Sequence, residues 1–470
     1  MPAIPLSHSA FDREGMPPKL LKNYYFESCP TNLEDQVTLR PRPRLERFAS
    51  VGAGPITGLY REGGVIAGRI VCRSGDSLYK VEQAGVPGVG TATLIGAVDG
   101  TGRMSAEGDT SNVVLTFGAT PYKTNGITID PIVMPDSLTT CAVDTLDQRF
   151  IFAVPSSNSF YWTPPGLYTV DGLDFASAES QPDVLITLKV VDDVLWLVGR
   201  LSLEAWVGTG DQDLPFQLIE GRVFGIGCTA RDTCQKMNID GLDTMCWVGT
   251  DRKVYRLDPN PVRISDFALE EALARVPEAT IPTMYGHTAI WNGHDFYVLH
   301  IPGEGTWTYD LTTRAGWTSW TSYGLDQFRT AVSTIGPNAR ALLGDDAEGT
   351  IWQLTEEQDT DDTDPVVFEA SGMLEVTGPP VQCFNAGLTV QTGNASDASE
   401  DPMMQCFVSD DHGKTIIKLP DQPLGRQANW TLRVLWTRLG MLTRERGRLF
   451  MWRTTKPVVI QKAWFNGGYR

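Results

Sequence analysis

The chain contains no run of about 18 apolar residues, the length that a membrane-spanning helix requires, so we expect no membrane-spanning segment. Residues 1–21 also lack a basic segment followed by an apolar core, which is the pattern of a secretory signal. The 8 cysteines include no C-x-x-C pair. Without a sign of secretion, we expect them to be buried, reduced thiols.

The sequence also lacks the short motifs that mark common active sites. It has no G-x-S-x-G, no P-loop and no dinucleotide fingerprint. Only 5 histidines are present, and His287, His294 and His300 lie within one short stretch. A metal site needs three or four converging ligands, and no carboxylate motif accompanies these three. We therefore expect hairpin side chains there, and no catalytic residue, cofactor or metal.

One octapeptide, "SDDHGKTI" at 409–416, resembles the Asp-box S-x-D-x-G-x-T-W, with Ile416 in place of Trp. In that motif the Ser and Asp side chains fix a tight turn by bonding to the backbone. A glycosidase would additionally need two facing carboxylates, and a pair of that kind has no signature among 57 acidic residues. The octapeptide therefore predicts a structural turn.

Glycine and proline are abundant, with 46 and 30 residues, which predicts many turns and an all-β fold. The net charge of −18 argues against a general phosphate-binding surface. The charge is uneven, because residues 433–470 hold seven Arg and two Lys against one acidic residue, Glu445.

A hairpin pattern recurs along the chain, as in "MCWVGTDRKVYRLD" (245–258) and "ALLGDDAEGTIWQL" (341–354). Each copy is an apolar strand, a polar turn and a second strand with a central aromatic. These aromatics lie 39 to 54 residues apart, the spacing of propeller blades, and we expect most of them to be buried. The alternative is a series of unrelated hairpins in sandwiches. The aromatics are Tyr79, Tyr122, Tyr161, Trp206, Tyr255, Tyr309 and Trp352.

The pattern predicts an all-β protein with a β-propeller of about six or seven blades and an additional C-terminal β domain. Residues 265–276 show helical periodicity with Ser265 or Asp266 as the N-cap, and predict an insertion in the propeller. Six carboxylates follow Trp352 in a segment without the offsets of a calcium loop, so we expect a solvated linker. The predicted parts are an extended N-terminal segment that packs on the other domains (1–50), the propeller (51–355), the acidic linker (356–365) and the C-terminal domain with its Arg-rich end (366–470).

The Arg-rich end alternates basic and apolar residues, which in a strand gives one buried face and one basic face. That face could meet an acidic partner or phosphate, and the alternative is a solvated face beside acidic neighbours in the same chain. The candidate inter-subunit or adaptor interface consists of Arg433, Arg438, Arg444, Arg446, Arg448 and Arg453.

Several segments resemble, in order, the tail hub or packaged-DNA stabilisation proteins of short-tailed double-stranded DNA bacteriophages. They begin with "NYYFESCPTNLEDQVTLRPRPRLERFASVGAGPITGLY" (23–60) and continue through "RISDFALEEAL" (263–273) and "TWTYDLTTRAGWTSW" (306–320). They end with "RVLWTRLGMLTRERGRLFMWRTTKPVVI" (433–460). The collinear order of the segments carries the resemblance.

The resemblance implies a structural, non-enzymatic role. Such a protein forms a ring, most often of six copies, that acts as a tail hub or nozzle and continues the channel of the portal and its adaptor ring. It retains packaged DNA, carries tailspikes or tail fibres and a needle or plug, and lets double-stranded DNA leave through its lumen without sequence-specific binding. The expected location is the virion tail, after assembly in the host cytoplasm. The alternatives are a propeller-type glycan-binding or glycan-hydrolysing tail protein and a cellular propeller scaffold.

Overall fold

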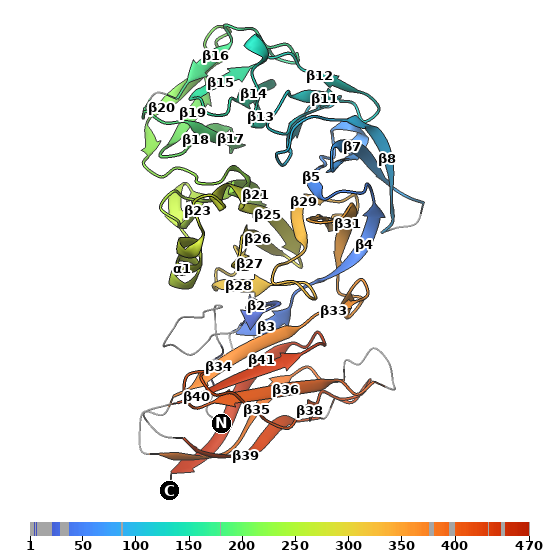
Figure 1. Cartoon of the computed structure of the whole chain (residues 1–470), viewed down its shortest axis with the longest axis vertical. Coiled ribbons are helices and arrows are strands. Elements are labelled where there is room, and N and C mark those ends of the chain that lie inside the picture. The colour runs from blue at the N-terminus through green and yellow to red at the C-terminus, as the bar shows by residue number, and fades with distance from the viewer. Residues whose placement is uncertain are drawn as a thin grey trace.

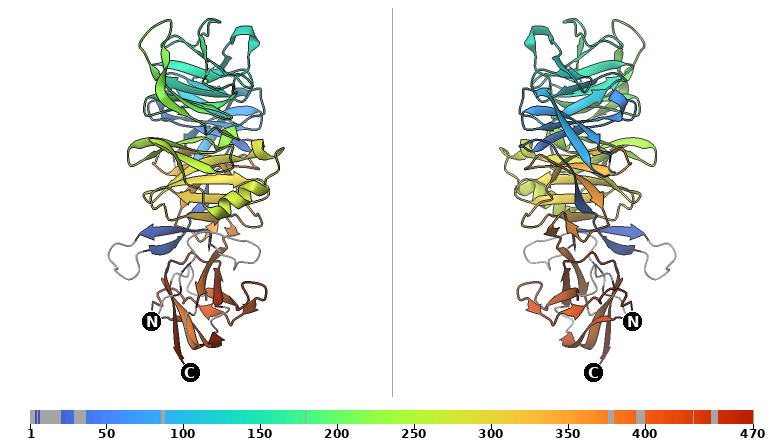
Figure 2. Two further views of the ribbon diagram at one scale, coloured as in Figure 1. Left: turned by 90° about the vertical axis from the view of Figure 1, so that its left-hand side faces the viewer. Right: turned by 90° about the vertical axis from the view of Figure 1, so that its right-hand side faces the viewer.

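The computed structural model shows an elongated, strand-rich molecule with a propeller at one end of its long axis and a β-sandwich at the other (Figures 1 and 2). Within the described residues no helix is long and apolar enough to cross a bilayer. The described residues are 4, 6, 21–28, 37–85, 88–178, 180–375, 380–393, 400–430, 432–442 and 447–469.

Seven four-stranded units form the propeller, as the hairpin repeat predicted. In each blade the strands run antiparallel, and the first strand of each of blades 1 to 7 lies nearest the axis. Blade 1 consists of β5 (Ile56–Tyr60), β6 (Ile70–Ser74), β7 (Ser77–Gln83) and β8 (Gly90–Ala97). Blade 2 consists of β9 (Ser105–Gly108), β10 (Val113–Thr116), β11 (Tyr122–Thr124) and β12 (Ile129–Pro131). Blade 3 consists of β13 (Ala142–Leu146), β14 (Arg149–Ala153), β15 (Ser159–Trp162) and β16 (Phe175–Ser177).

The remaining blades follow the same order along the chain, with the last one completed by a strand from the N-terminal region. Blade 4 consists of β17 (Leu185–Val191), β18 (Val194–Gly199), β19 (Leu203–Gly208) and β20 (Phe216–Phe224), and blade 5 of β21 (Gln235–Ile239), β22 (Leu242–Val248), β23 (Val254–Asp258) and β24 (Asn260–Arg263). Blade 6 consists of β25 (Tyr285–Trp291), β26 (His294–Ile301), β27 (Gly305–Asp310) and β28 (Trp317–Trp320). Blade 7 consists of β29 (Thr330–Ile335), β30 (Ala341–Asp345), β31 (Thr350–Thr355) and β4 (Arg44–Ser50).

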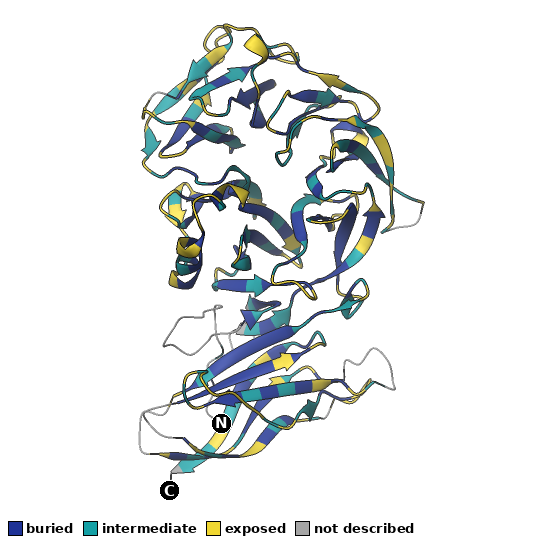
Figure 3. Ribbon diagram, viewed as in Figure 1, coloured by how far each residue is buried: buried dark blue, intermediate teal, exposed yellow. Residues whose placement is uncertain are grey.

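Each of the seven predicted aromatics lies in the third strand of its blade. Tyr122, Tyr255, Tyr309 and Trp352 are buried, and the other three are half-buried. Neighbouring blades share hydrophobic clusters, which appear as buried residues along the inner strands (Figure 3). The spacing of the aromatics therefore equals the length of the blade repeat. Each blade contributes one such aromatic, because a hairpin buries its apolar face only against the next blade.

Strand β4 closes the ring by pairing antiparallel with β31, opposite Trp352 and Leu354. A cluster of residues from blades 7 and 1, including Phe48, Ile56 and Ile351, fills the seam. Closure therefore joins segments about 300 residues apart in sequence, so that the two ends of the propeller hold each other.

The helix expected over 265–276 is α1 (Phe267–Arg275), between blades 5 and 6. Asp266 is its N-cap, because its side chain accepts a hydrogen bond from the Leu269 amide. Leu269 and Leu273 pack into the core between these two blades. Phe267, the first residue of the helix, is 54% exposed.

Two facing sheets form the β-sandwich around a core that includes Phe450, Trp452 and Trp436. Three N-terminal strands belong to it, and β1 also pairs with β28, so that one sheet runs from blade 6 into the sandwich. The first sheet is β1 (Leu21–Lys22), β34 (Phe368–Leu374), β40 (Arg448–Thr454), β36 (Met403–Ser409) and β37 (Ile417–Lys418), with β38 (Gln422–Pro423) paired to β36; the second is β2 (Tyr24–Ser28), β3 (Val37–Pro41), β41 (Ile460–Tyr469), β35 (Val381–Val390) and β39 (Val434–Leu442).

A buried ion pair lies where the propeller meets the β-sandwich. Arg42 is fully buried, and its guanidinium donates to both carboxylate oxygens of Asp361, at 3.1 and 2.5 Å. It also donates to the side chain of Asn23 (2.9 Å) and to the carbonyl of Thr321 (2.9 Å). Asp361 in turn accepts from the amide of Leu45 (3.0 Å). The contact therefore joins the N-terminal strands, blade 6 and the segment after blade 7.

The acidic segment 356–365 differs from the solvated linker that the sequence predicts. It contains the short hairpin β32 (Thr360–Asp361) and β33 (Asp364–Pro365), and Asp361 is 2% exposed. Two backbone carbonyls of the segment also accept hydrogen bonds from Arg44. The segment differs from the prediction because the buried arginines of the N-terminal strands need hydrogen-bond acceptors, and segment 356–365 provides them. Amino-acid composition alone does not reveal this need.

The cysteines of the described residues are free and buried, as predicted. Burial raises the pKa of the Cys141 and Cys234 thiols to about 11, so neither is a reactive thiolate at neutral pH. Cys29 lies outside the described residues.

We expect Asp361→Asn to lower the free energy of unfolding by about 3 kcal/mol, because the Arg42 charge would remain buried without its counter-ion. Asp362→Asn is the matched control. Its ion pair with Arg47 is exposed (37% and 48% of the side chains), so a loss below about 1 kcal/mol is expected. Urea denaturation of both variants measures the difference, and equal losses would contradict the special role of Asp361.

Candidate functional site

The six arginines predicted as an interface do not form a single surface. Arg444 and Arg446 lie outside the described residues. Arg433 and Arg438 are exposed, beside and within β39 of the second sandwich sheet, whereas Arg448 and Arg453 lie in β40 of the first sheet. The alternation in sequence therefore spans two strands of different sheets.

Arg448 is occupied inside the chain. It is 5% exposed and forms a bidentate ion pair with Asp410 at 2.5 and 2.6 Å. It also donates to the carbonyl of Leu439. We therefore remove Arg448 from the candidate interface, because its guanidinium stabilises the sandwich.

Arg453 retains an exposed guanidinium, with 51% of the side chain accessible, although it pairs with Glu369. It lies 5.6 Å from the ring centre of Phe407. These three residues border a hollow of about 180 Å³, which Met451 and Ile416 also line. The surface at Arg453 is thus partly apolar and partly charged, which is the composition of many protein interfaces.

The octapeptide 409–416 forms the turn that its resemblance to the Asp-box predicts. Ser409 Oγ donates to Asp411 Oδ1 (2.8 Å), and the amides of Gly413 and Thr415 donate to Ser409 Oγ (2.8 Å) and Asp411 Oδ1 (2.7 Å). Hydrogen bonds from Thr415 and Ser409 lower the pKa of Asp411 to about 2. Ser409 and Asp411 therefore hold the turn, as expected for a structural role.

The axis of the propeller is crossed by an ion-pair cluster that sequence reasoning missed. Lys236 on β21 of blade 5 reaches Glu107 on β9 of blade 2 (2.5 Å) and Asp144 on β13 of blade 3 (3.1 Å). Burial raises the pKa of Glu107 to about 7, and the Asp144 charge adds to this effect. Burial would lower the pKa of Lys236, but the two carboxylates outweigh it and raise that pKa. The three groups thus tie non-adjacent blades together.

A second set of polar contacts lies beside this cluster. Arg231, in η3 (Arg231–Thr233), donates to the carbonyls of Cys141 (2.9 Å) and Arg103 (3.1 Å). Arg103 pairs with Asp346 of blade 7 (3.0 Å) and covers the ring of Tyr285 in blade 6. The axis of a single chain is therefore occupied by side chains from five of its blades and by η3. One sequence signal was Asp144, a charged residue within the largely apolar strand β13.

The three clustered histidines are hairpin side chains that bond within blades 6 and 7. His294 Nδ1 is 2.8 Å from Asp310, and His287 Nε2 is 3.0 Å from Thr330. His300 stacks on Tyr285, with ring centres 4.6 Å apart. Burial, together with the charge of Arg103, lowers the pKa of His287 to about 3 and that of His300 to about 4. Among the described residues there is no group of three or more potential metal ligands.

Comparison with known proteins identifies the family. A family model described as bacteriophage P22 Gp10, beta-propeller, matches residues 19–359, which is more than half of the chain. The chain belongs to this phage stabilisation family. It is therefore a phage tail protein of the packaged-DNA stabilisation type, and both the family and the propeller predicted from the sequence are confirmed.

Solved structures resemble the tail protein only distantly. The extracellular domain of a hybrid two component system from B. thetaiotaomicron has a TM-score of 0.43 at 9% identity, covering 73% of this chain and 43% of that chain. The beta-propeller domain of Cps50 (Swd1) from Myceliophteria thermophila has a TM-score of 0.41 at 11% identity, covering 66% of this chain and 100% of that one. The chain thus spans less than half of the first of these proteins. A search of curated proteins gives no match.

We expect Lys236→Met to lower the free energy of unfolding of the tail protein by about 2 kcal/mol. The change leaves Glu107 and Asp144 facing each other without a cation, and the loss is smaller than for a fully buried pair because 34% of the Lys236 side chain is accessible. Glu107→Gln is the matched control, since it keeps the ion pair of Lys236 with Asp144. Chemical denaturation should give a higher free energy of unfolding for Glu107→Gln than for Lys236→Met. The reverse order would contradict a stabilising role of the ion-pair cluster.

We also expect acid to destabilise blade 6 through its histidines. The pKa of His287 in the folded state lies below its ordinary value of 6.5, so the unfolded chain binds the proton first. The contribution of His287 to the free energy of unfolding is therefore fully present above pH 6.5. It falls as the pH drops toward 3, by at most about 1.4 kcal/mol per pH unit. His300, which is less buried, adds a smaller loss. His287→Gln with His300→Gln should flatten the fall in melting temperature between pH 6.5 and 5, whereas exposed His412→Gln should leave it unchanged.

Proposed function

We propose that this protein is a ring-forming tail hub or nozzle that continues the portal and adaptor channel and retains packaged DNA. Membership of the phage stabilisation family is the observation that carries the proposal. The ring also provides the attachment point for tailspikes or fibres and for the needle. During ejection, DNA passes through the lumen of the ring.

The charges at the two ends of the molecule support ring formation from identical copies. Residues 101–224, which include blades 2 to 4 at the end far from the sandwich, contain 16 acidic and 6 basic residues. Residues 401–470, most of which belong to the sandwich, contain 12 basic and 5 acidic residues. A closed ring requires a patch on one copy to meet a different patch on the next, and opposite charges favour such a pairing.

The occupied axis of the propeller supports a lumen enclosed between copies. Lys236, Glu107, Asp144 and Arg231 bridge the axis of one chain, so a DNA duplex has no path along it. With a net charge of −18 per chain, the wall of a lumen between copies would be acidic. Such a wall repels phosphate and makes few counterion-releasing contacts, which lets DNA slide during ejection.

The proposal assigns the exposed arginines of the second sandwich sheet to the contact with a neighbouring copy or with the adaptor ring. Arg433, just before β39, and Arg438, within it, are the two described members of the predicted set that are exposed at the same strand. An arginine can hold a carboxylate with two parallel hydrogen bonds, which fixes orientation as well as attraction.

We expect Arg433→Glu with Arg438→Glu to reduce ring assembly on adaptor-bearing heads at least tenfold, because two attractions become repulsions. Arg263→Glu with Arg340→Glu makes the same change of charge at exposed sites of blades 5 and 7, outside both charged ends, and should assemble normally. Electron microscopy of the purified protein and of assembled tails gives the copy number and the yield. Normal rings from the first variant would exclude this contact, and tails that never contain the protein would refute the hub itself.

A further inference from the structure

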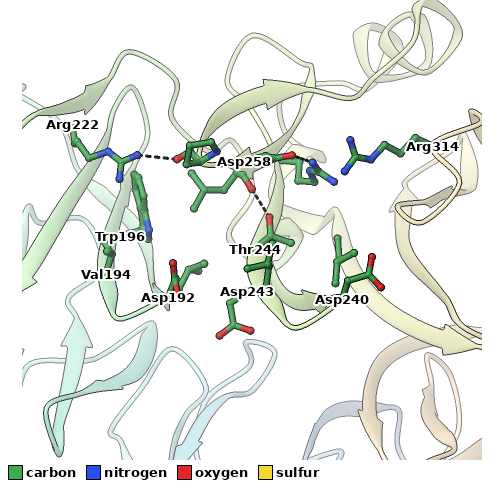
Figure 4. Close-up of a pocket in the computed structure, with 15 residues that line it drawn as sticks. Asp192, Val194, Trp196, Arg222, Asp240, Asp243, Thr244, Asp258 and Arg314 are labelled. Carbon is green, nitrogen blue, oxygen red and sulfur yellow. Dashed lines mark hydrogen bonds and ion pairs between the residues drawn. The ribbon is translucent and has the colours of Figure 1, made fainter.

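A pocket of about 310 Å³ opens between blades 4 and 5 of the propeller. The turns that join β17 to β18 and β21 to β22 border it, together with strands β20 and β23 and the loop after β27 (Figure 4). The volume lies at the lower end of the range for small-ligand sites. Its lining combines arginines, aspartates and an apolar floor.

One end of the pocket carries more guanidinium than carboxylate. Arg256 is 6% exposed, and its Nε has no hydrogen-bond partner among the described residues. Its terminal nitrogen pairs with Asp258. Arg314 lines the same end of the pocket from the neighbouring blade (Figure 4), and its charge acts on Arg256, so that this end holds two guanidiniums and one carboxylate, Asp258. Burial and the charge of Arg314 both lower the pKa of Arg256. An added anion would relieve this imbalance.

Arg222 forms a wall of the pocket and is already engaged. It donates to the carbonyl of Pro259 (3.2 Å) and to the side chain of Asn260 (3.3 Å), and it lies 5.6 Å from the ring centre of Trp196. These contacts connect β20 of blade 4 with the β23–β24 turn of blade 5. The pocket is therefore shaped by fixed contacts between the two blades.

The opposite side of the pocket presents hydrogen-bond acceptors. Asp192 and Asp240 are exposed on two separate turns, Asp243 is exposed near the start of β22, and Figure 4 shows the three side chains across the pocket from Arg222 and Arg314. Asp192 and Asp240 have φ angles of 54° and 53°, which hold the tight turns in place. Ionised carboxylates only accept hydrogen bonds, so a ligand must bring donors to this side.

We propose that this pocket binds an acidic saccharide, such as a hexuronic acid unit of a polysaccharide. The sugar carboxylate lies between Arg256 and Arg314, and its hydroxyl groups donate to Asp192, Asp240 and Asp243. A neutral sugar would leave the paired guanidiniums without an anion. An acidic peptide side chain would satisfy the arginines but leave the carboxylates without donors. A phosphate would likewise satisfy the arginines but bring no ring of hydroxyl groups to the carboxylates on the opposite side.

The test is ligand-observed NMR on the full chain with D-glucuronate as the probe. We expect saturation transfer to glucuronate, and Arg314→Gln to weaken the binding about tenfold or more, since a charge-assisted hydrogen bond is lost. Asp192→Asn should weaken it less, because an amide oxygen still accepts. The control Arg340→Gln removes an exposed arginine of blade 7 and should leave binding unchanged.

Comparison probes separate the carboxylate from the hydroxyl groups. Glucose should bind much more weakly than glucuronate, and so should N-acetylglutamate amide, which carries a carboxylate without hydroxyls. Equal binding of the glutamate derivative would overturn the saccharide proposal in favour of an acidic protein segment. Absence of glucuronate binding, or binding unaffected by Arg314→Gln in a variant with an unchanged melting temperature, would overturn the site. The hub proposal rests on family membership and not on this pocket, so either result leaves the hub proposal standing.

Discussion

The buried pair of Arg42 and Asp361 is the contact on which the relative placement of propeller and sandwich depends. Removing two charges from water costs several kcal/mol per ion, and this cost is offset only when every donor and acceptor is satisfied. Here the donors of Arg42 reach Asp361, Asn23 and Thr321, from three separate segments of the chain. The N-terminal strands, blade 6 and the segment after blade 7 must therefore be in place together.

The same N-terminal region closes the propeller, because β4 is the outer strand of blade 7 while β1 to β3 belong to the sandwich. The ion pairs of Lys236 across the axis then add links between blades that do not touch as neighbours. The chain is thus held at the closure of the propeller, across the propeller axis and at the contact between propeller and sandwich. These contacts leave little freedom for the blades to separate from one another. In the proposed ring, movement during DNA ejection would therefore occur between copies rather than within one propeller.

The distribution of charge is a property of the surfaces, and it differs from the distribution along the sequence. Arg448 belongs to the basic stretch but serves the interior through Asp410, whereas Arg433 and Arg438 remain exposed. In the propeller, Arg256 and Arg314 come from different blades and both line one pocket. The positions available to partners and ligands are those left over after internal pairing.

The sequence by itself determined the features that depend on neighbours a few residues away: the blade repeat with its third-strand aromatics, the helix that Asp266 caps, and the turn that Ser409 and Asp411 hold. Each follows from a local period or a short hydrogen-bonding motif. Only the tertiary structure decided that β4 completes blade 7, that Asp361 is buried, and that Lys236 faces Glu107. These pairings join residues 100 or more positions apart, and one carboxylate among 57 carries no sign of which cation it will meet until the chain has closed.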